Sequence, residues 1–277
     1  MKPVLTSTRH PLVRRIRALA EREAREAEGR LLVEGIRLLE EVLDAGIPIE
    51  VLVYDPDAAT GRAAAVLARA RQQGARLVPA APHVVAACSQ VETPQGLVAV
   101  VHRPTVDEQA LLASPDLLLA VADGVQDPGN LGAIIRAADA AGATGVLVTG
   151  GVDPHHPKVV RASMGSLFHL PVKAVPPAQA RDLLAGRGVR VLVADPRGEV
   201  EYTEADYSRP VALVVGSEAR GPDPAWRDAA ETTVRIPLYG RAESLNVALA
   251  AGLLLYEARR WERGKKEEGR GKRGERA

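Results

Sequence analysis

Residues 127–145 read DPGNLGAIIRAADAAGATG, which places a glycine-punctuated turn directly before an apolar helix that carries one arginine, Arg136. Glycines that open a helix often let a ligand approach the backbone. The apolar run LLLAVAD precedes this stretch and VLVTGG follows it, so a strand, a helix and another strand succeed one another. This succession predicts a parallel sheet with its ligand site at the carboxyl ends of the strands.

The same alternation continues on both sides of this stretch. The first hundred residues alternate helical and strand-like segments, and the polar run RPTVDEQALLASPD separates them from a second series that ends in the apolar helix SLNVALAAGLLLYEARRWERG. The sequence therefore predicts an α/β protein of two domains. We expect an N-terminal domain over residues 1–103, a linker over 104–116, a second domain over 117–263 and a disordered basic tail over 264–277.

The composition is that of a globular protein. Of the 277 residues, 46% are hydrophobic and 26% charged, and no apolar run approaches the roughly 20 residues that a membrane span requires. The net charge is only +1, but residues 1–20 hold five basic side chains and no acid, and the C-terminal tail is also basic. Basic ends are typical of a polyanionic partner, and equally of a solvated helix face at the start and a disordered tail at the end. The single cysteine, Cys88, excludes an internal disulfide, and we expect a cytoplasmic protein with no membrane segment.

Several common site types are excluded by spacing. Gly124, Gly129 and Gly132 do not form the G-x-G-x-x-G of a dinucleotide site, and no G-K-[ST] follows. His155 and His156 are adjacent and have no acidic or thiol partner at ligand spacing, so we expect no metal. No serine lies in a nucleophile elbow.

Three strand-to-loop junctions of the second domain concentrate polar and small residues: DPGNLGAIIRAADAAG, LVVGSEARGP from Leu213, and IPLYGRAESLNVALAAGLLLYE from Ile236. Each alone could be an ordinary loop, with Asn130 as a turn residue and Ser244 as a helix N-cap. Arg136 could likewise form a surface pair with Asp139 or Glu218. Together and in this order, however, the three junctions are a much more specific signal of a functional site than each one alone. They also contain Asn130 and Asn246, the only asparagines of the chain.

The second domain, from about Leu117 to Arg260, resembles the SpoU (TrmH-like) RNA ribose 2'-O-methyltransferases of the SPOUT superfamily. PGNLGAIIR, GSEARG and ESLNVALA match the three motifs of that family in order and spacing. The stretch TSTRHPLVRRIRALAEREAREAEGRLLVEGIRLLEEVL resembles the L30e-like RNA-binding domain that precedes the catalytic domain in one branch of the family. The resemblance covers nearly the whole chain.

This resemblance implies a deep trefoil knot, S-adenosyl-L-methionine as the methyl donor, and a homodimer formed through the C-terminal domain. By motif position it implies a donor-binding set and a catalytic set. The donor-binding residues would be Gly216, Ile236, Leu245, Thr149, Gly150, Leu238 and Gly221. The catalytic residues would be Arg136, Asn130, Glu218, Ser244 and Asn246. We expect Arg136 to hold a phosphate and position the 2'-hydroxyl, since a guanidinium does not lose its proton readily.

The resemblance further implies a structured RNA substrate, because only RNA offers a 2'-hydroxyl. We expect ribosomal (23S) RNA, since two-domain relatives more often modify it. A tRNA 2'-O-methyltransferase and a non-catalytic RNA-binding protein that retains the fold are the alternatives. The expected RNA-binding residues are Arg9, Arg14, Arg15, Arg37 and Arg136.

Overall fold

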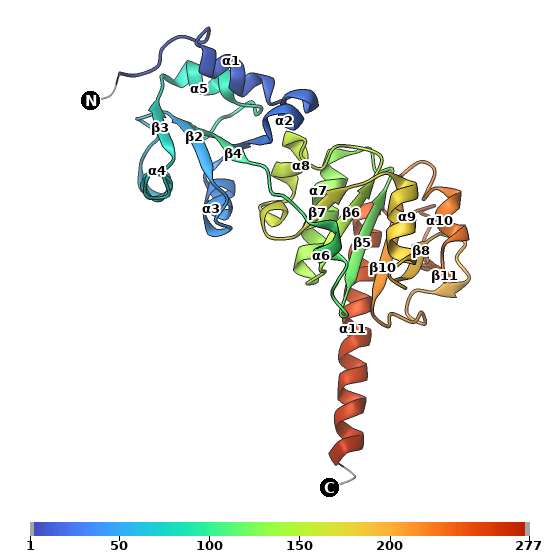
Figure 1. Ribbon diagram of the computed structural model, residues 1–277. Helices are drawn as coiled ribbons and strands as arrows, with labels where there is room; N and C mark the ends of the chain where they lie inside the picture. Colours follow the sequence, from blue (N-terminus) through green and yellow to red (C-terminus); the bar gives the residue numbers. More distant parts are fainter. Residues whose placement is uncertain (1–2, 275–277) are drawn as a thin grey trace. The chain divides into compact units, whose positions relative to one another are not determined.

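The computed structural model describes residues 3–274, with side chains through residue 265. The chain divides into two compact units (Figure 1). Unit 1 contains the residues up to Thr105 together with His155–His169, and unit 2 contains Val106–Pro154 and the residues from Leu170 onward.

Unit 1 is an α/β unit built on a small mixed sheet. The strand order is β1-β4-β2-β3, in which β4 runs antiparallel to β1 and to β2, and β2 runs parallel to β3. Leu32, Val53 and Val100 from three of these strands pack with side chains of α1 and α5. The elements are α1 (Pro11–Ala18), α2 (Arg22–Glu28), β1 (Arg30–Glu34), α3 (Ile36–Asp44), β2 (Ile49–Tyr54), α4 (Gly61–Gln72), β3 (Arg76–Pro79), α5 (Pro82–Cys88) and β4 (Leu97–His102).

Unit 1 also includes α8 (Pro157–Ala162) and the 3-10 turn η1 (Ser166–Phe168), which lie far along the chain. The sequence boundaries predicted this segment within the second domain. One polar contact of this segment is an ion pair in which Arg161 donates to the carboxylate of Glu34 at 2.9 Å, and only 8% of the Glu34 side chain is exposed. No spacing rule reports a salt bridge between positions 127 residues apart.

Unit 2 is a three-layer arrangement around a parallel sheet. In the part of the chain that the structure describes, the strand order is β7-β6-β5-β10-β8-β11-β9, and every paired neighbour is parallel. The elements are α6 (Glu108–Leu111), β5 (Leu118–Asp123), α7 (Pro128–Ala140), β6 (Gly145–Thr149), β7 (Val172–Ala174), α9 (Pro177–Ala185), β8 (Arg190–Ala194), β9 (Val200–Glu201), β10 (Val211–Gly216), α10 (Pro224–Asp228), β11 (Thr232–Arg235) and α11 (Val247–Gly274).

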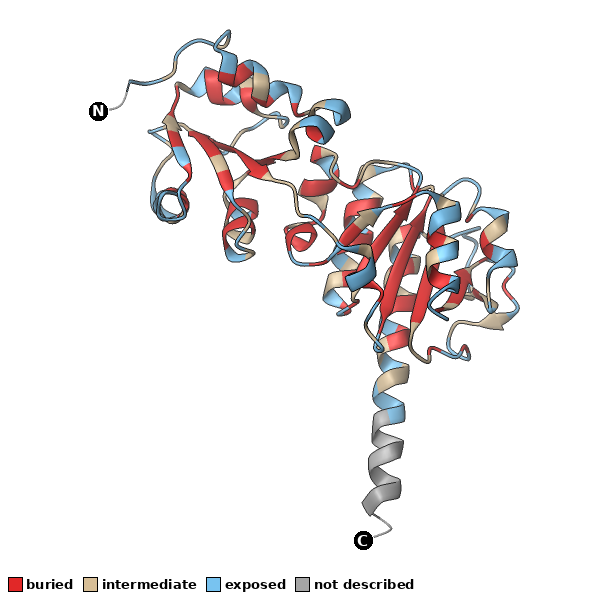
Figure 2. Ribbon diagram, viewed as in Figure 1, coloured by how far each residue is buried: buried red, intermediate tan, exposed pale blue. Residues whose placement is uncertain are grey.

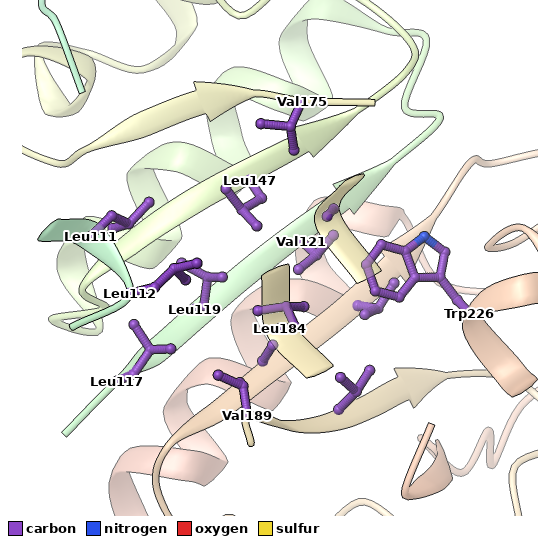
Figure 3. Close-up of a cluster of buried hydrophobic side chains, with 14 of the residues drawn as sticks. Leu111, Leu112, Leu117, Leu119, Val121, Leu147, Val175, Leu184, Val189 and Trp226 are labelled. Atoms are coloured by element: carbon purple, nitrogen blue, oxygen red, sulfur yellow. The ribbon is translucent and has the colours of Figure 1, made fainter. Parts of the chain in front are cut away.

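Both faces of this sheet are covered, which is why its central strands are continuous apolar runs (Figure 2). Alternate residues of β5 point to opposite faces. Leu119 and Val121 join a cluster with Leu184 of α9 and the fully buried Trp226 of α10 (Figure 3). On the other face, α7 and α11 pack against each other and against the sheet. The predicted α/β class with a parallel sheet is confirmed.

Two segments differ from their sequence expectations. The region 104–116, which composition predicts to be a linker, contains α6 and buries Leu111 and Leu112 in the unit 2 cluster. The backbone of α11 continues to Gly274, through most of the segment for which composition predicts disorder. Lys, Arg and Glu are good helix formers, so a charged tail can extend a helix that packing has nucleated. Residues 275–277 lie outside the described part of the chain.

None of the helices in the described residues combines the length and apolar character that crossing a membrane requires.

Candidate functional site

The carboxyl ends of β5, β6 and β10 are tied together by one buried carboxylate. Asp123, which is 5% exposed, ends β5 and accepts from Thr149 Oγ1 at 2.6 Å and from the backbone N–H of Asp223 at 2.7 Å. A buried carboxylate is tolerated where donors satisfy it. Asp123 thus holds the loop after β10 against the neighbouring strand ends.

The loop after β10 turns back on itself tightly. The backbones of Ser217 and Gly221 exchange two hydrogen bonds, of 3.1 and 2.9 Å. A Cβ on Gly216 would lie 1.8 Å from the backbone nitrogen of Pro222, so the missing side chain of Gly216 makes room for the chain's own turn rather than for a ligand. Gly221 has a φ of +69° and open space beside it, so it needs glycine for conformation.

This turn and the segment after β11 enclose a pocket of about 340 Å³. Five of the seven residues expected to bind the donor line it: Gly216, Gly221, Ile236, Leu238 and Leu245. Thr149 and Gly150 are not among its lining residues. Thr149 is buried and its hydroxyl donates to Asp123, which supports the strand end, and Gly150 is exposed.

A chain of hydrogen bonds joins the three sequence motifs. Asn130 Nδ2 donates to Glu218 Oε1 at 2.6 Å, and Asn246 Nδ2 donates to Asn130 Oδ1 at 2.9 Å. Asn246 Oδ1 also accepts from the backbone N–H groups of Ala248 and Leu249, so Asn246 caps α11, the role considered for Ser244. Asp127 caps α7 by accepting from the Asn130 N–H at 2.8 Å. The bonds to Glu218 and Asn246 fix the Asn130 carboxamide through its nitrogen and its oxygen.

Arg136 lies on α7 two turns beyond the start of that helix and is exposed. Within the described residues its guanidinium forms no hydrogen bond or ion pair, so the surface pair with Asp139 or Glu218 is not present. Ser244 is also exposed and lines the pocket. The structure thus brings Glu218, Asn130 and Asn246 into one network, with Ser244 at the adjoining pocket.

The arginines expected to bind RNA in unit 1 differ in their surroundings. Arg9, Arg14 and Arg37 are exposed. Arg15 instead binds Glu28 at 2.7 Å and both carboxylate oxygens of Glu50, and these hydrogen bonds raise the pKa of Arg15. Its charge is already compensated within the protein.

The sequence reasoning did not single out three residues around the pocket. Asp123 is the strand-end carboxylate described above, and Asp195 and Arg227 line the pocket as an ion pair of 2.5 Å. A signal for both aspartates was present, because each directly follows an apolar strand run, LLLAVAD and VRVLVAD. Nothing in the sequence indicated that Arg227 would reach Asp195.

The pocket fits an adenosyl sulfonium donor in size and lining. Small-molecule sites usually measure about 300–1,000 Å³ and combine apolar walls with a few polar groups. Ile236, Leu238 and Leu245 supply the apolar wall, and the 217–221 turn supplies backbone polar groups. The Glu218 carboxylate at its edge favours a cationic group.

Two domain families match the chain. The SpoU rRNA methylase family matches residues 117–256, and the MRM3-like substrate binding domain matches residues 10–99.

Relatives match along almost the whole chain. The chain is 35% identical to the Bacillus subtilis 23S rRNA (guanosine(2553)-2'-O)-methyltransferase RlmP, covering 92% of this chain and 98% of that protein. It is 36% identical to the Streptomyces viridochromogenes 23S rRNA (uridine(2479)-2'-O)-methyltransferase, covering 87% and 86%. The crystal structure of the SpoU methyltransferase AviRb from Streptomyces viridochromogenes with AdoMet superposes with a TM-score of 0.84 at 34% identity, covering 92% of this chain and 98% of that one. The chain belongs to the SpoU rRNA methylase family, and its reaction is S-adenosylmethionine-dependent 2'-O-methylation of RNA.

Proposed function

We propose that this protein methylates the 2'-hydroxyl of one ribose in 23S ribosomal RNA, with the pocket beside the 217–221 turn holding S-adenosylmethionine. The hydrogen-bonded chain Glu218–Asn130–Asn246 carries the proposal, because it joins the three family motifs beside a pocket of suitable size. The donor supplies a methyl group on a sulfonium, and cleavage of its carbon–sulfur bond provides most of the driving force. The protein must place the 2'-oxygen in line and manage its proton.

Arg136 is the proposed phosphate-binding residue. Its guanidinium is exposed on α7, carries a permanent charge and has no ion pair within the described residues. A planar fork of N–H donors suits a phosphate of the target nucleotide, and holding that phosphate fixes the ribose. The hydroxyl proton passes to the phosphate or to water, because the guanidinium is a poor base.

Asn130 and Ser244 are the proposed contacts to the reacting nucleotide. The Asn130 carboxamide retains one N–H and one lone pair after its bonds to Glu218 and Asn246. Glu218 and Asn246 act through Asn130 by fixing its orientation. A hydrogen-bond donor that is already held in place stabilises charge on the 2'-oxygen more effectively than a mobile one.

Unit 1 is the proposed docking unit for the RNA. The match to a substrate-binding domain over residues 10–99 supports this role, as do the exposed Arg9, Arg14 and Arg37. The names of the relatives in Bacillus subtilis and Streptomyces viridochromogenes support 23S rRNA over tRNA.

The test is transfer of labelled methyl from S-adenosylmethionine to total RNA that lacks the modification, followed by nuclease mapping of the labelled nucleoside. Label on a 2'-O-methyl nucleoside at one 23S position is the expected result. Label confined to tRNA would contradict the proposal that 23S rRNA is the substrate. No label in any RNA, despite donor binding measured by calorimetry, would favour a non-catalytic RNA-binding protein.

We further propose that the chain is cytoplasmic, carries the trefoil knot of its superfamily in unit 2 and forms a homodimer through α11. Leu249 and Tyr256 support the dimer: they lie seven residues apart on one helix face and are 53% and 55% exposed. Equilibrium sedimentation tests it, and a monomer at micromolar concentration would contradict it.

A further inference from the structure

The loop between β11 and α11 holds an unusually exposed aromatic ring. Tyr239 is 92% exposed, the largest fraction among the large apolar side chains of the described residues. Its neighbour Leu238 lines the pocket and Ser244 follows on the same loop. Tyr239 therefore extends from the rim of the donor pocket into solvent.

The Tyr239 ring is not packed in the core of unit 2. Tyr207 provides the contrast: it is fully buried, and its hydroxyl donates to the carbonyl of Tyr202 at 2.7 Å. The Tyr239 hydroxyl forms no hydrogen bond within the described residues, and the ring leaves its apolar faces in water. Tyrosine is enriched at binding interfaces, where its ring contacts a partner and its hydroxyl stays hydrated.

The charges around this ring indicate the kind of ligand. Arg220, which also lines the pocket, and Arg241, two residues after Tyr239 in the sequence, are exposed and form no side-chain ion pair within the described residues. The carboxylates of Glu243 on the same loop and of Glu218 on the pocket wall offset part of this positive charge. The loop ends at Asn246, whose bond to Asn130 joins it to the helix of Arg136. Cationic groups around a free aromatic face match a nucleotide, which offers a phosphate and a π-stacking base.

We propose that Tyr239 stacks on the base of the nucleotide whose ribose is methylated, and so sets the approach of its 2'-hydroxyl. This inference rests on the proposed function. The contact requires only a π face and no base-specific hydrogen bond, so it orients the nucleotide without selecting its identity. The Tyr239 ring thus holds the base while Arg136 holds a phosphate.

The experiment is a double-mutant cycle between the ring and the base. Wild type, Tyr239→Ala, Tyr239→Leu and Tyr239→Phe are assayed on two RNA fragments that contain the mapped nucleotide. One fragment is intact, and the other has an abasic ribose with its 2'-hydroxyl retained at that position. Calorimetry with S-adenosylmethionine and sedimentation of each variant complete the measurement.

On intact RNA we expect Tyr239→Ala to lower kcat/KM by about 5- to 150-fold, the range of one base–aromatic stack. Tyr239→Leu should resemble it, and Tyr239→Phe should stay close to wild type because the ring remains. On abasic RNA all four proteins should be equally slow. Donor affinity should not change, since Tyr239 is not among the residues that line the pocket, and the oligomeric state should not change, since the proposed dimer forms through α11.

Three results would overturn the stacking contact. One is an equal loss on intact and abasic RNA, since the ring would then act on the protein. Another is wild-type activity of Tyr239→Ala. The third is a shift in oligomeric state with Tyr239→Ala, which would assign the ring to a second copy of the chain. A wild-type protein that methylates no RNA would instead defeat the proposed function itself.

Discussion

Two polar clusters of this protein, one around Glu50 in unit 1 and one around Asn130 in unit 2, differ in how far their charges are compensated. In unit 1, Arg15 and Arg30 surround Glu50, and Arg15 also binds Glu28, so positive and negative groups compensate each other. In unit 2, the amides of Asn130 and Asn246 form a hydrogen-bonded chain with Glu218. Arg136, on the same helix as Asn130, stays uncompensated within the described residues.

The difference separates stability from binding. A cluster that saturates its charges internally has no capacity left for a ligand and contributes to the fold. A cluster that keeps a free guanidinium and a partly used carboxamide has such capacity and gains little stability from it. Substitutions in the first cluster should therefore change stability at constant activity. Loss of the free guanidinium in the second should change activity at constant stability.

The largest effect is expected at Arg136. Arg136→Ala should lower kcat at saturating RNA by about 10²-fold, the order expected when the reacting groups lose their alignment. The free energy of unfolding should change by less than about 0.5 kcal/mol because the side chain is exposed. Methyl transfer and thermal unfolding measure the two quantities, and Arg136→Lys is the matched variant that keeps the charge. Near-normal turnover of Arg136→Ala would show that the free guanidinium of Arg136 has no role in methyl transfer.

Gly216→Ala should lower both stability and donor binding, since Gly216 lines the pocket and also packs against the turn that forms it. The added Cβ would lie 1.8 Å from Pro222 N, and relieving that overlap should cost about 2–3 kcal/mol and weaken donor binding. Gly221→Ala has open space and meets only the strain of a positive φ, about 1–2 kcal/mol. Urea unfolding and donor titration measure both variants. An equal cost for the two would contradict the steric reason.

Asn246 allows its two roles to be separated. Asn246→Ala removes the cap of α11 and the bond to Asn130, and should cost about 1 kcal/mol of stability and on the order of tenfold in kcat/KM. Asn246→Asp keeps the cap acceptor and loses the donor to Asn130. It should therefore retain stability while losing activity. If Asn246→Asp were as active as wild type, the bond to Asn130 would have no functional role.

The smallest effect is expected at Glu50. Hydrogen bonds from Arg15 and Arg30 lower the pKa of Glu50 from 4.5 to about 2. A lowered pKa means that this stabilisation is complete above about pH 4.5 and is lost as the pH falls through about 2. Glu50→Gln should cost about 1 kcal/mol or less at neutral pH, given its partial exposure, and the difference from wild type should shrink over that window. Denaturant unfolding as a function of pH tests this.

Activity of the Glu50→Gln variant completes the comparison. Methyl transfer at neutral pH should equal that of wild type, because Glu50 lies in the compensated cluster of unit 1. A loss of RNA affinity would show that this cluster also takes part in binding.

Much of the fold followed from local patterns. Continuous apolar strands alternating with helices predicted the parallel sheet, and that prediction is confirmed. The resemblance to the SpoU family implied seven donor-binding residues, and five of them line the pocket beside the 217–221 turn. Position at a strand end did not indicate that the Thr149 side chain would be buried. The hydroxyl of Thr149 turns to Asp123, a partner 26 residues away.

The sequence by itself determined the α/β class, the parallel sheet and the three polar motifs, because strand and helix periods and glycine-rich turns are local properties of the chain. Only the tertiary structure decided which polar groups compensate each other. It paired Arg15 with Glu50 and Arg161 with Glu34, joined Asn130 to Glu218 and Asn246, and left Arg136 and Tyr239 exposed. Hydrogen bonds and ion pairs form over a few ångströms in space, and residues far apart in sequence meet only when the chain is folded.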